Sequence, residues 1–285
     1  MAANPWQAAG IGLAQMVIVL AGMILFGSLL NIVARFTLRR SSAEWRLLRI
    51  DRFWLVNTLL APLMLALFAG FAWLFHLSLS DIGFNLNNLG LSLGVGIPLG
   101  LLLGLPSAIA APIAARQGLA PMRVPFGRTL FDTVGAIGYA AILVGPLEEI
   151  PFRGIIQTLL MRAMPQQGII GPFSIALGTF VAAFVFVFYH YRNVMLGGES
   201  QVQFWRQVPG RLVASFILSF LYQGTGSLLG PILFHNILDT CTIASLSISM
   251  YRLRKQGKLP PTVPPPINPA PPLIDPAEQQ AQNYV

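Results

Sequence analysis

Charged side chains are scarce in this sequence: only 10% of the residues are Asp, Glu, Lys or Arg, whereas 55% are hydrophobic. A soluble domain carries about 25% charged residues, so this composition excludes an ordinary water-soluble protein. Segments of about ten residues that alternate between apolar and polar, which mark the strands of a membrane barrel, are also missing. Because backbone groups in lipid must be paired within their own segment, the remaining fold is a bundle of helices.

Cysteine and the marks of a secretory leader are scarce as well. The single cysteine, Cys241, excludes an intrachain disulfide and lies in an apolar stretch, where we expect it to pack in the core. The first ten residues, MAANPWQAAG, contain no basic residue. The apolar run that follows is far longer than the ~7–15 residues of a signal h-region. We therefore expect this run to stay in the membrane as an anchor.

Long apolar stretches are abundant. Five of them approach or exceed the ~20 residues that cross the hydrocarbon core as a helix, and two more are shorter or interrupted by glycine. The seven stretches cover residues 8–34, 53–77, 89–115, 131–147, 169–191, 211–224 and 228–250. The sequence therefore predicts an all-α, polytopic transmembrane helical bundle of about seven spans, within a range of about six to eight.

Basic residues are concentrated in alternate connections between these stretches. The chain has 18 basic and 10 acidic residues, a net charge of +8. Sixteen of the basic residues lie in four connections: Arg35, Arg39, Arg40, Arg46, Arg49, Arg52; Arg116, Arg123, Arg128; Arg192, Arg206, Arg211; and Arg252, Arg254, Lys255, Lys258. The positive-inside rule then predicts an integral membrane protein, of the plasma membrane, with its N-terminus outside and its C-terminus in the cytoplasm. The basic charge is explained by topology and by contact with membrane lipids, so we expect no nucleic-acid partner.

Two further patterns organise the chain without carrying chemistry. Gly96, Gly100 and Gly104 recur every four residues in the third apolar stretch, which predicts a stripe where a neighbouring helix approaches closely. From Leu259 the sequence is rich in proline and cannot support a core, so we predict a disordered, extended tail. A partner that recognises proline-rich segments is the alternative interpretation of this tail.

Two adjacent acidic residues, Glu148 and Glu149, interrupt the fourth apolar stretch in the sequence LEEIPFRG. An ionised group at bilayer depth costs at least ~2.5 kcal/mol and marks a functional site by default. Pro146 and Pro151 flank the pair, and each removes an intrahelical hydrogen bond and displaces the backbone. We therefore expect a broken or kinked helix here, with room for water.

The spacing of the charges separates the two glutamates. Arg153 lies four residues after Glu149 and hence on the same helix face, so the two can neutralise each other. Glu148 points about 100° away and has no local partner. The alternative is that all three residues cap helix ends at the membrane surface and only hold the bundle together.

Histidine is present three times. His76 lies at the end of a span, where we expect a solvated interfacial residue. His190 closes the stretch FVFYH, four residues after Phe186, and His235 opens HNILD, with Asp239 one helical turn later. A lone buried histidine is more often structural than catalytic, but two of them on different apolar helices, together with unpaired carboxylates, favour an active site.

These residues resemble the CAAX protease and bacteriocin-processing (CPBP) family of intramembrane metalloproteases, which includes the CAAX prenyl endopeptidases and the Abi-type immunity proteins. Three motifs match in order: EExxxR as Glu148, Glu149 and Arg153; FxxxH as Phe186 and His190; and HxxxN/D as His235 and Asp239. The better studied prenyl endopeptidases carry asparagine where this chain has Asp239. With this resemblance the chain divides into N-terminal transmembrane helices and basic loops (1–130), a CPBP-like catalytic core (131–250), and a basic stop with a proline-rich cytoplasmic tail (251–285).

The resemblance implies hydrolysis of a peptide bond in a membrane-associated or lipid-modified protein or peptide. In one version, Glu148 with His190 activates a water molecule, and His235 and Asp239 stabilise the oxyanion. In the other, Glu148, His190 and His235 hold a zinc ion with an open position for water, although no HExxH motif is present. Glu149, Arg153 and Phe186 then support the site from behind.

The positions of the two histidines conflict with a simple bundle. Counted from the starts of their apolar stretches, His190 lies about 17 residues into its helix but His235 only about seven into a parallel one, a depth mismatch of ~15 Å at ~1.5 Å per residue. Strong tilt, a fifth span that begins above the membrane, or a re-entrant hairpin over 220–232 could bring the imidazoles together.

Other functions fit parts of the pattern. A proton-coupled transporter also uses embedded Glu, His and Asp residues, but usually has more spans and internal repeats. A haem protein could use His190 and His235 as axial ligands, which leaves the acidic pair unexplained. A non-catalytic family member could act as a membrane scaffold or regulator. Turnover that is lost in Glu148→Ala but kept in Glu149→Gln would favour the protease.

Overall fold

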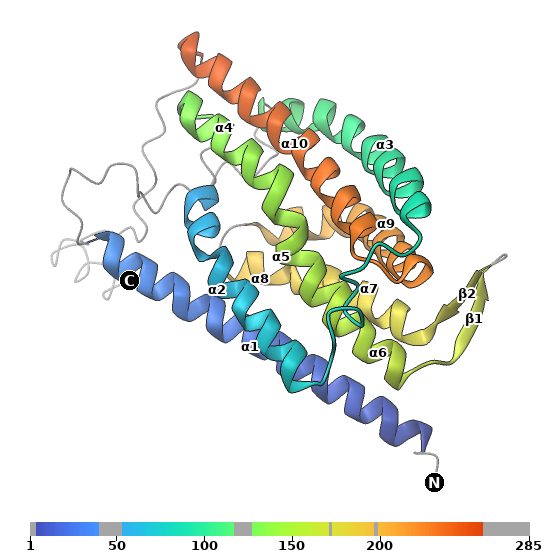
Figure 1. The fold of residues 1–285 in the computed structure, drawn as a ribbon. Helices are drawn as coiled ribbons and strands as arrows, with labels where there is room; N and C mark the ends of the chain where they lie inside the picture. The colour runs from blue at the N-terminus through green and yellow to red at the C-terminus, as the bar shows by residue number, and fades with distance from the viewer. Residues whose placement is uncertain (1–3, 40–52, 117–126, 171–172, 197–198, 259–285) are drawn as a thin grey trace, which may run out of the picture.

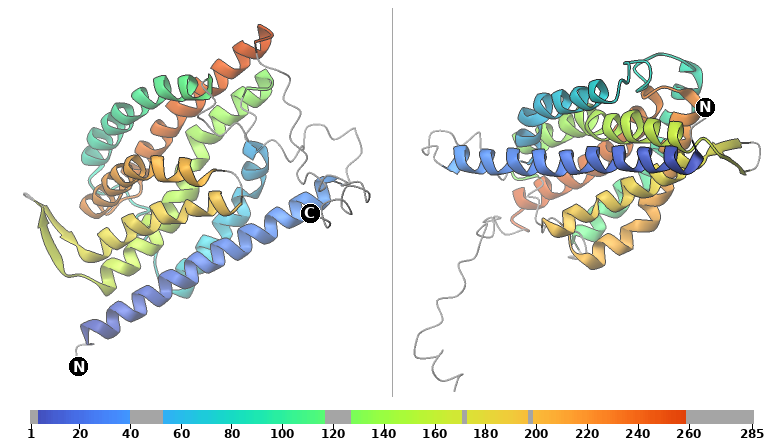
Figure 2. Two further views of the ribbon diagram at one scale, coloured as in Figure 1. Left: turned by 180° about the vertical axis from the view of Figure 1, so that it is seen from behind. Right: turned by 90° about the horizontal axis from the view of Figure 1, so that it is seen from below.

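The computed structural model describes residues 4–39, 53–116, 127–170, 173–196 and 199–258. The described chain is a bundle of helices arranged around one long central helix (Figure 1). The surrounding helices are α1 (Pro5–Arg39), α2 (Phe53–Leu74), α3 (Leu89–Arg116), α7 (Leu177–Tyr189), α8 (Tyr191–Met195), α9 (Gln201–Thr225) and α10 (Leu229–Lys255). The predicted all-α helical bundle is confirmed (Figure 2), with about seven helices, of which five are candidate membrane spans. Three segments with sequence-based predictions lie outside the described residues: the tail from Leu259 and the parts of two basic connections at 40–52 and 117–126.

The central helix changes its winding twice around the acidic pair. It consists of α4 (Leu130–Tyr139), the π-helical segment η2 (Ala140–Val144), α5 (Gly145–Glu149), the π-helical segment η3 (Ile150–Gln157) and α6 (Thr158–Ala163). A π-helical turn contains one residue more than an α-helical turn, and such segments occur frequently at functional sites. The two prolines predicted to disturb this helix coincide with these changes: Pro146 follows η2, and Pro151 lies within η3.

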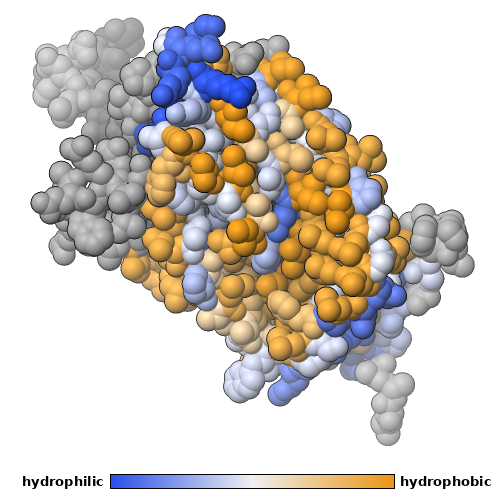
Figure 3. Space-filling view, turned by 45° about the horizontal axis from the view of Figure 1, so that its top comes forward, coloured by the Kyte–Doolittle hydropathy of each residue, from blue (hydrophilic) through white to orange (hydrophobic). Residues whose placement is uncertain are grey.

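The core of the bundle surrounds η3 and α6. All eight residues of η3 are buried, and Phe152, Ile155, Ile156 and Leu160 are among the largest fully buried side chains. By contrast, large apolar side chains on the outside of the other helices are exposed, including Trp73. Figure 3 shows a broad hydrophobic belt with hydrophilic residues gathered toward opposite ends of the visible face. Exposed apolar surface of this extent is what a lipid environment requires.

Five described helices are long and apolar enough to cross a membrane. They are Pro5–Leu30, Trp54–Leu74, Leu89–Ile113, Leu130–Ala163 and Leu229–Lys255. The fifth apolar stretch, expected to be helical over 169–191, differs from the prediction because its first part forms a β-hairpin. Strands β1 (Gln167–Ile170) and β2 (Phe173–Ala176) pair antiparallel, with Gln167 opposite Ala176, and α7 begins only at Leu177. Pro165 and Gly168 disfavour continuation of the helix, and the isoleucine-rich sequence around them suits a strand.

The glycine stripe of α3 packs against α10, as predicted. A Cβ atom at Gly96 would lie 2.7 Å from the carbonyl oxygen of Gly230, and one at Gly104 would lie 3.0 Å from the Cβ of Cys241. The absence of side chains therefore allows the two backbones to approach closely. Cys241 is half-buried in this helix contact.

The connection between α9 and α10 is a tight turn. Helix α9 is continuous through Thr225 and ends at Gly226, which has a left-handed backbone conformation with φ of 65°. Helix α10 begins at Leu229, so residues 220–232 comprise the end of one long helix, a turn and the start of the next helix. A glycine in this conformation is a common helix ending because it has no Cβ penalty. The turn is held by Asn85, whose side-chain amide donates to the carbonyl of Gly226 at 2.8 Å.

Candidate active site

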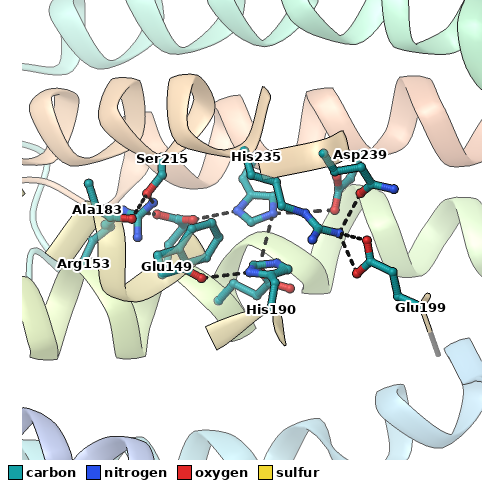
Figure 4. Close-up of polar contacts among 12 residues, drawn as sticks. Glu149, Arg153, Ala183, His190, Glu199, Ser215, His235 and Asp239 are labelled. Carbon is teal, nitrogen blue, oxygen red and sulfur yellow. Dashed lines mark hydrogen bonds and ion pairs between the residues drawn. The ribbon is translucent and has the colours of Figure 1, made fainter. Parts of the chain in front are cut away.

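Glu149 lies at the centre of a buried polar cluster formed by the central helix and α10 (Figure 4). Its side chain is 0% exposed. Its Oε1 atom lies 2.6 Å from Nδ1 of His235, and its Oε2 atom lies 3.3 Å from Nε of Arg153. The pairing of Glu149 with Arg153, predicted from their spacing of four residues, is present. The contact with His235 adds a second partner, so one carboxylate holds side chains from two helices.

Arg153 is fully buried and is surrounded by α7 and α9. Its Nη2 atom donates to the hydroxyl of Ser215 at 3.3 Å, and Ser215 donates in turn to the carbonyl of Ala183 at 2.9 Å. The guanidinium carbon lies 4.3 Å from the centre of the Phe186 ring, a cation–π contact. A buried cation needs this combination of a counter-ion, a hydroxyl and an aromatic face to offset its loss of hydration.

Glu148 projects from the same turn of helix in a different direction and remains partly accessible. Its side chain is 35% exposed, and its Oε2 atom lies 3.7 Å from Nε2 of His190 and 3.7 Å from Nε2 of His235. The structure therefore brings together the acidic pair and the two histidines, which come from three separate helical segments. The predicted difference in direction between the two glutamates is visible in their different partners.

The hairpin shortens the helix that precedes His190 and so reduces the expected mismatch in histidine depth. Because α7 starts at Leu177, His190 directly follows a helix of 13 residues rather than a full span that starts at 169. His235 is in the second turn of α10. Of the three arrangements considered from the sequence, this late start of α7 is most similar to a fifth span that begins above the membrane.

The hydrogen bond of His190 fixes its neutral tautomer. Nδ1 lies 2.9 Å from the carbonyl oxygen of Phe186, and since a carbonyl can only accept, Nδ1 carries the proton. In neutral His190 the Nε2 atom, which faces Glu148, therefore has a free electron pair. The FxxxH spacing is explained: the first residue supplies both this carbonyl and the ring that lies over Arg153.

Asp239 lies one turn after His235 on α10. Its Oδ2 atom is 3.6 Å from Nε2 of His235, and its side chain is partly exposed. The same Nε2 atom thus faces the carboxylates of both Glu148 and Asp239, whereas Nδ1 is held by Glu149. His235 therefore contacts three carboxylates through its two ring nitrogens.

A second buried ion pair borders the cluster. Glu199 is buried and both of its carboxylate oxygens lie 3.1 Å from Nη2 of Arg211, which also donates to Gln207 (Figure 4). Together with the capping box of Ser200 and Gln203, this pair fixes the start of α9 beside the segment that follows His190. His76, by contrast, is exposed in the turn after α2, as expected.

Comparison with known families covers the part of the chain that builds this cluster. Residues 131–241 match the family model described as type II CAAX prenyl endopeptidase Rce1-like. The predicted resemblance to the CAAX protease family is confirmed. No match was found among curated proteins or among solved structures. The Rce1-like segment contains all the motif residues, and the match supports a CAAX-type intramembrane endopeptidase in general.

The fit of a metal ion to the Rce1-like segment was tested on its side chains. Glu148, His190 and His235 are of the types that bind zinc. However, within the described residues no group of three or more His, Cys, Asp or Glu side chains is arranged to hold a metal ion. We therefore derive no step through a metal.

Two polar residues of the Rce1-like segment were not identified from the sequence. Ser215 on α9 contacts Arg153, and Asn236 on α10 accepts a hydrogen bond from the backbone N–H of Gly145 at 2.7 Å. Each could have been noticed as a polar residue within an apolar helix, because burial of such a side chain costs free energy unless it has a hydrogen-bond partner. The sequence could not name either partner, because each lies more than 60 residues away along the chain.

Proposed function

We propose that the protein is an intramembrane endopeptidase that hydrolyses a peptide bond near the lipid-modified C-terminus of a membrane-bound protein or peptide. The observation that carries this proposal is the position of the Glu148 carboxylate, at 3.7 Å from Nε2 of both His190 and His235. At this separation the carboxylate makes no direct hydrogen bond to either imidazole, so these polar atoms can contact a water molecule bound beside them. The resemblance to prenyl endopeptidases supports a prenylated substrate.

In the proposed mechanism, Glu148 and the free electron pair of His190 orient one water molecule. Glu148 takes a proton from this water as the oxygen attacks the scissile carbonyl carbon, which forms a tetrahedral intermediate with a negative oxygen. The same proton then passes to the leaving amine nitrogen as the carbon–nitrogen bond breaks. The products are a new carboxylate and a new protonated amine, which receives the second proton of the water, so the step consumes only water.

In the proposed mechanism His235 stabilises the oxyanion, and Asp239 orients His235. With Nδ1–H held by Glu149, a protonated His235 can donate Nε2–H to the developing negative oxygen. Asp239 holds Nε2 in place by charge until the substrate arrives. Glu149, in turn, is kept ionised beside the guanidinium of Arg153, so the buried pair supports the position of the imidazole.

We further propose that the chain lies in the plasma membrane with its N-terminus outside and its C-terminus in the cytoplasm. The last turn of α10 carries Arg252, Arg254 and Lys255, and α3 ends at Arg116. Helix α1 begins without a basic residue in its first turns. These ends follow the positive-inside rule. A cysteine placed at Gly257 in a Cys241→Ser background should react with a membrane-impermeant thiol reagent only after cells are opened.

The proposed activity is tested with the purified protein in liposomes and a farnesylated peptide that ends in Cys-aliphatic-aliphatic-X, the sequence recognised for prenylation. Mass spectrometry should detect the released C-terminal residues. Glu148→Gln and His190→Asn should each lower kcat about a hundredfold or more, since the first removes the base that takes a proton from water and the second removes the group that orients this water. His76→Asn is the matched control, because this histidine is exposed in the turn after α2.

The outcome separates the proposed enzyme from its rivals. Cleavage by Glu148→Gln at the wild-type rate would contradict the mechanism. A wild-type protein that binds the farnesylated peptide but never cuts it would indicate a scaffold or regulator. Glu148→Gln expressed in membranes also serves as a trap, and mass spectrometry of the peptides that it retains would identify natural substrates. An unmodified peptide of the same sequence shows whether the lipid is required.

A further inference from the structure

Asn236 makes a contact that is not used by the proposed mechanism. Its Oδ1 atom accepts a hydrogen bond of 2.7 Å from the backbone N–H of Gly145, the first residue of α5. Gly145 follows the π-helical segment η2 and precedes Pro146, which has no backbone N–H to donate. The hydrogen bond therefore joins α10 to the central helix at the point where its winding changes.

The backbones are in direct contact at this place. A Cβ atom at residue 145 would lie 2.6 Å from Oδ1 of Asn236 and 3.0 Å from the carbonyl oxygen of Ile232. Contacts shorter than 3.0 Å require a shift of one partner, and here both neighbours belong to α10. Glycine at this position is thus needed for the close approach of the two helices.

Two contacts, one helical turn apart, join the same two helices. Gly145 meets Asn236, and Glu149, four residues later, meets His235 at 2.6 Å. The two partners on α10 are adjacent in the chain. Together the contacts fix both the separation and the axial register of α5 relative to α10. Glu148 lies between these two anchor points in the sequence and has no such bond of its own.

We propose that Asn236 is a positioning residue that sets the Glu148 carboxylate between the two imidazoles. This inference rests on the proposed function, because it assigns Asn236 a role in that same site. A buried N–H that loses its acceptor must find another partner, so removal of the Asn236 amide shifts or rotates α5. A displacement of only ~1 Å at a catalytic group can lower a rate about a hundredfold.

Four variants test this role. Asn236→Leu removes the acceptor with little change in size, and Asn236→Asp keeps a side-chain oxygen of the same reach. Gly145→Ala pushes α5 away from α10, whereas Gly138→Ala is the matched control, because a Cβ there meets nothing within 4 Å. Asn236→Leu and Gly145→Ala should lower kcat about tenfold or more while KM stays within about twofold, because substrate contacts are retained. Asn236→Asp should recover most of the activity, and Gly138→Ala should match the wild type.

A second measurement needs no substrate and so separates this inference from the proposed function. The chain has three histidines, so ¹⁵N-histidine labelling gives three sets of imidazole signals, and the set lost in His235→Gln belongs to His235. Asn236→Leu should shift the His235 signals and leave those of His76 unchanged, in protein whose thermal unfolding remains cooperative. If the wild type cleaves no peptide, the proposed function fails and these signals still decide the role of Asn236.

Three results would overturn the inference. The first is wild-type kcat in both Asn236→Leu and Gly145→Ala. The second is an unchanged set of His235 signals in Asn236→Leu, since a shifted α5 must alter the bond between His235 and Glu149. The third is an Asn236→Asp variant as impaired as Asn236→Leu, because the side-chain oxygen would then not be the feature that matters.

Discussion

The Nδ1 atom of His235 lies 2.6 Å from Oε1 of Glu149, and this bond joins α10 to the central helix deep within the bundle. The second oxygen of the same carboxylate faces the buried guanidinium of Arg153. Glu149 therefore connects the cation that neutralises it to the imidazole that it orients. Such a carboxylate acts on chemistry without contacting the substrate.

The first prediction concerns Glu149→Gln. From the sequence alone this variant would be tolerated, but the structure predicts that it loses activity. An amide has no charge, so it cannot neutralise Arg153 while it also holds the imidazole of His235 by a charged hydrogen bond. We expect kcat to fall about tenfold or more while KM changes little, as for other residues that orient a catalytic histidine. The kcat of the variant is measured by cleavage of the farnesylated peptide. Turnover at the wild-type rate would contradict the role given to Glu149.

The second prediction concerns the stability of the buried ion pair. Removal of one member of such a pair costs about 3–5 kcal/mol, whereas replacement of both by apolar residues is often nearly neutral. Glu149→Leu and Arg153→Leu should therefore each lower the unfolding temperature of the detergent-solubilised protein more than the double variant does. The double variant should be inactive nevertheless. Equal or additive losses in the double variant would show that the two charges do not compensate each other.

Local spacing was enough to predict the parts of the site that lie within one helix. A separation of four residues placed Arg153 beside Glu149, and a repeat of four predicted the glycine stripe of α3. Both follow from the geometry of a single helix, in which residues four apart share a face. The three motifs then identified which helices meet, because the family pattern carries information about tertiary contacts.

Contacts made by residues outside these motifs were beyond sequence reasoning. Ser215 and Asn236 were missed because their partners, Arg153 and Gly145, are remote in the chain and the partner of Asn236 is a backbone group. The depth mismatch of the histidines arose because an unbroken apolar stretch was interpreted as one straight helix. Apolar periodicity cannot distinguish a helix from a strand in a short segment. The hairpin at 167–176 is such a segment, and its apolar residues were therefore read as part of a helix.

The third prediction concerns metal removal. If Glu148 activates water directly, cleavage of the farnesylated peptide should be unchanged after treatment with a chelator and dialysis, and added zinc should not raise kcat. A control metalloprotease in the same buffer should lose its activity. Loss of activity that zinc restores, together with one zinc per chain by elemental analysis, would instead make Glu148, His190 and His235 a zinc site.

The fourth prediction concerns the close contact between α3 and α10. Gly96→Val should lower the unfolding temperature, because a Cβ at this position would lie 2.7 Å from the carbonyl oxygen of Gly230, a backbone atom that cannot move alone. The expected cost is about 1–3 kcal/mol, typical of an overpacked site. Gly94→Val is the matched control in the same helix, since a Cβ there meets nothing within 4 Å. Equal unfolding temperatures for the two variants would contradict the packing role of the stripe.

The last prediction concerns Asp81, in the connection between α2 and α3 outside the membrane-spanning helices. Hydrogen bonds from the hydroxyl and backbone N–H of Ser78, together with the charge of Arg162, hold the pKa of this carboxyl below its ordinary value of 3.8. A lowered pKa stabilises the fold above the ordinary value, and this stabilisation is lost as the pH falls through the lowered pKa. Asp81→Asn should therefore unfold at a lower temperature than the wild type near neutral pH. The difference should shrink once the pH falls below 3.8. Unfolding temperatures of both proteins, measured from neutral pH to below 3.8, show whether the difference shrinks as expected. A difference that grows toward acid pH would show that ionised Asp81 does not stabilise the fold.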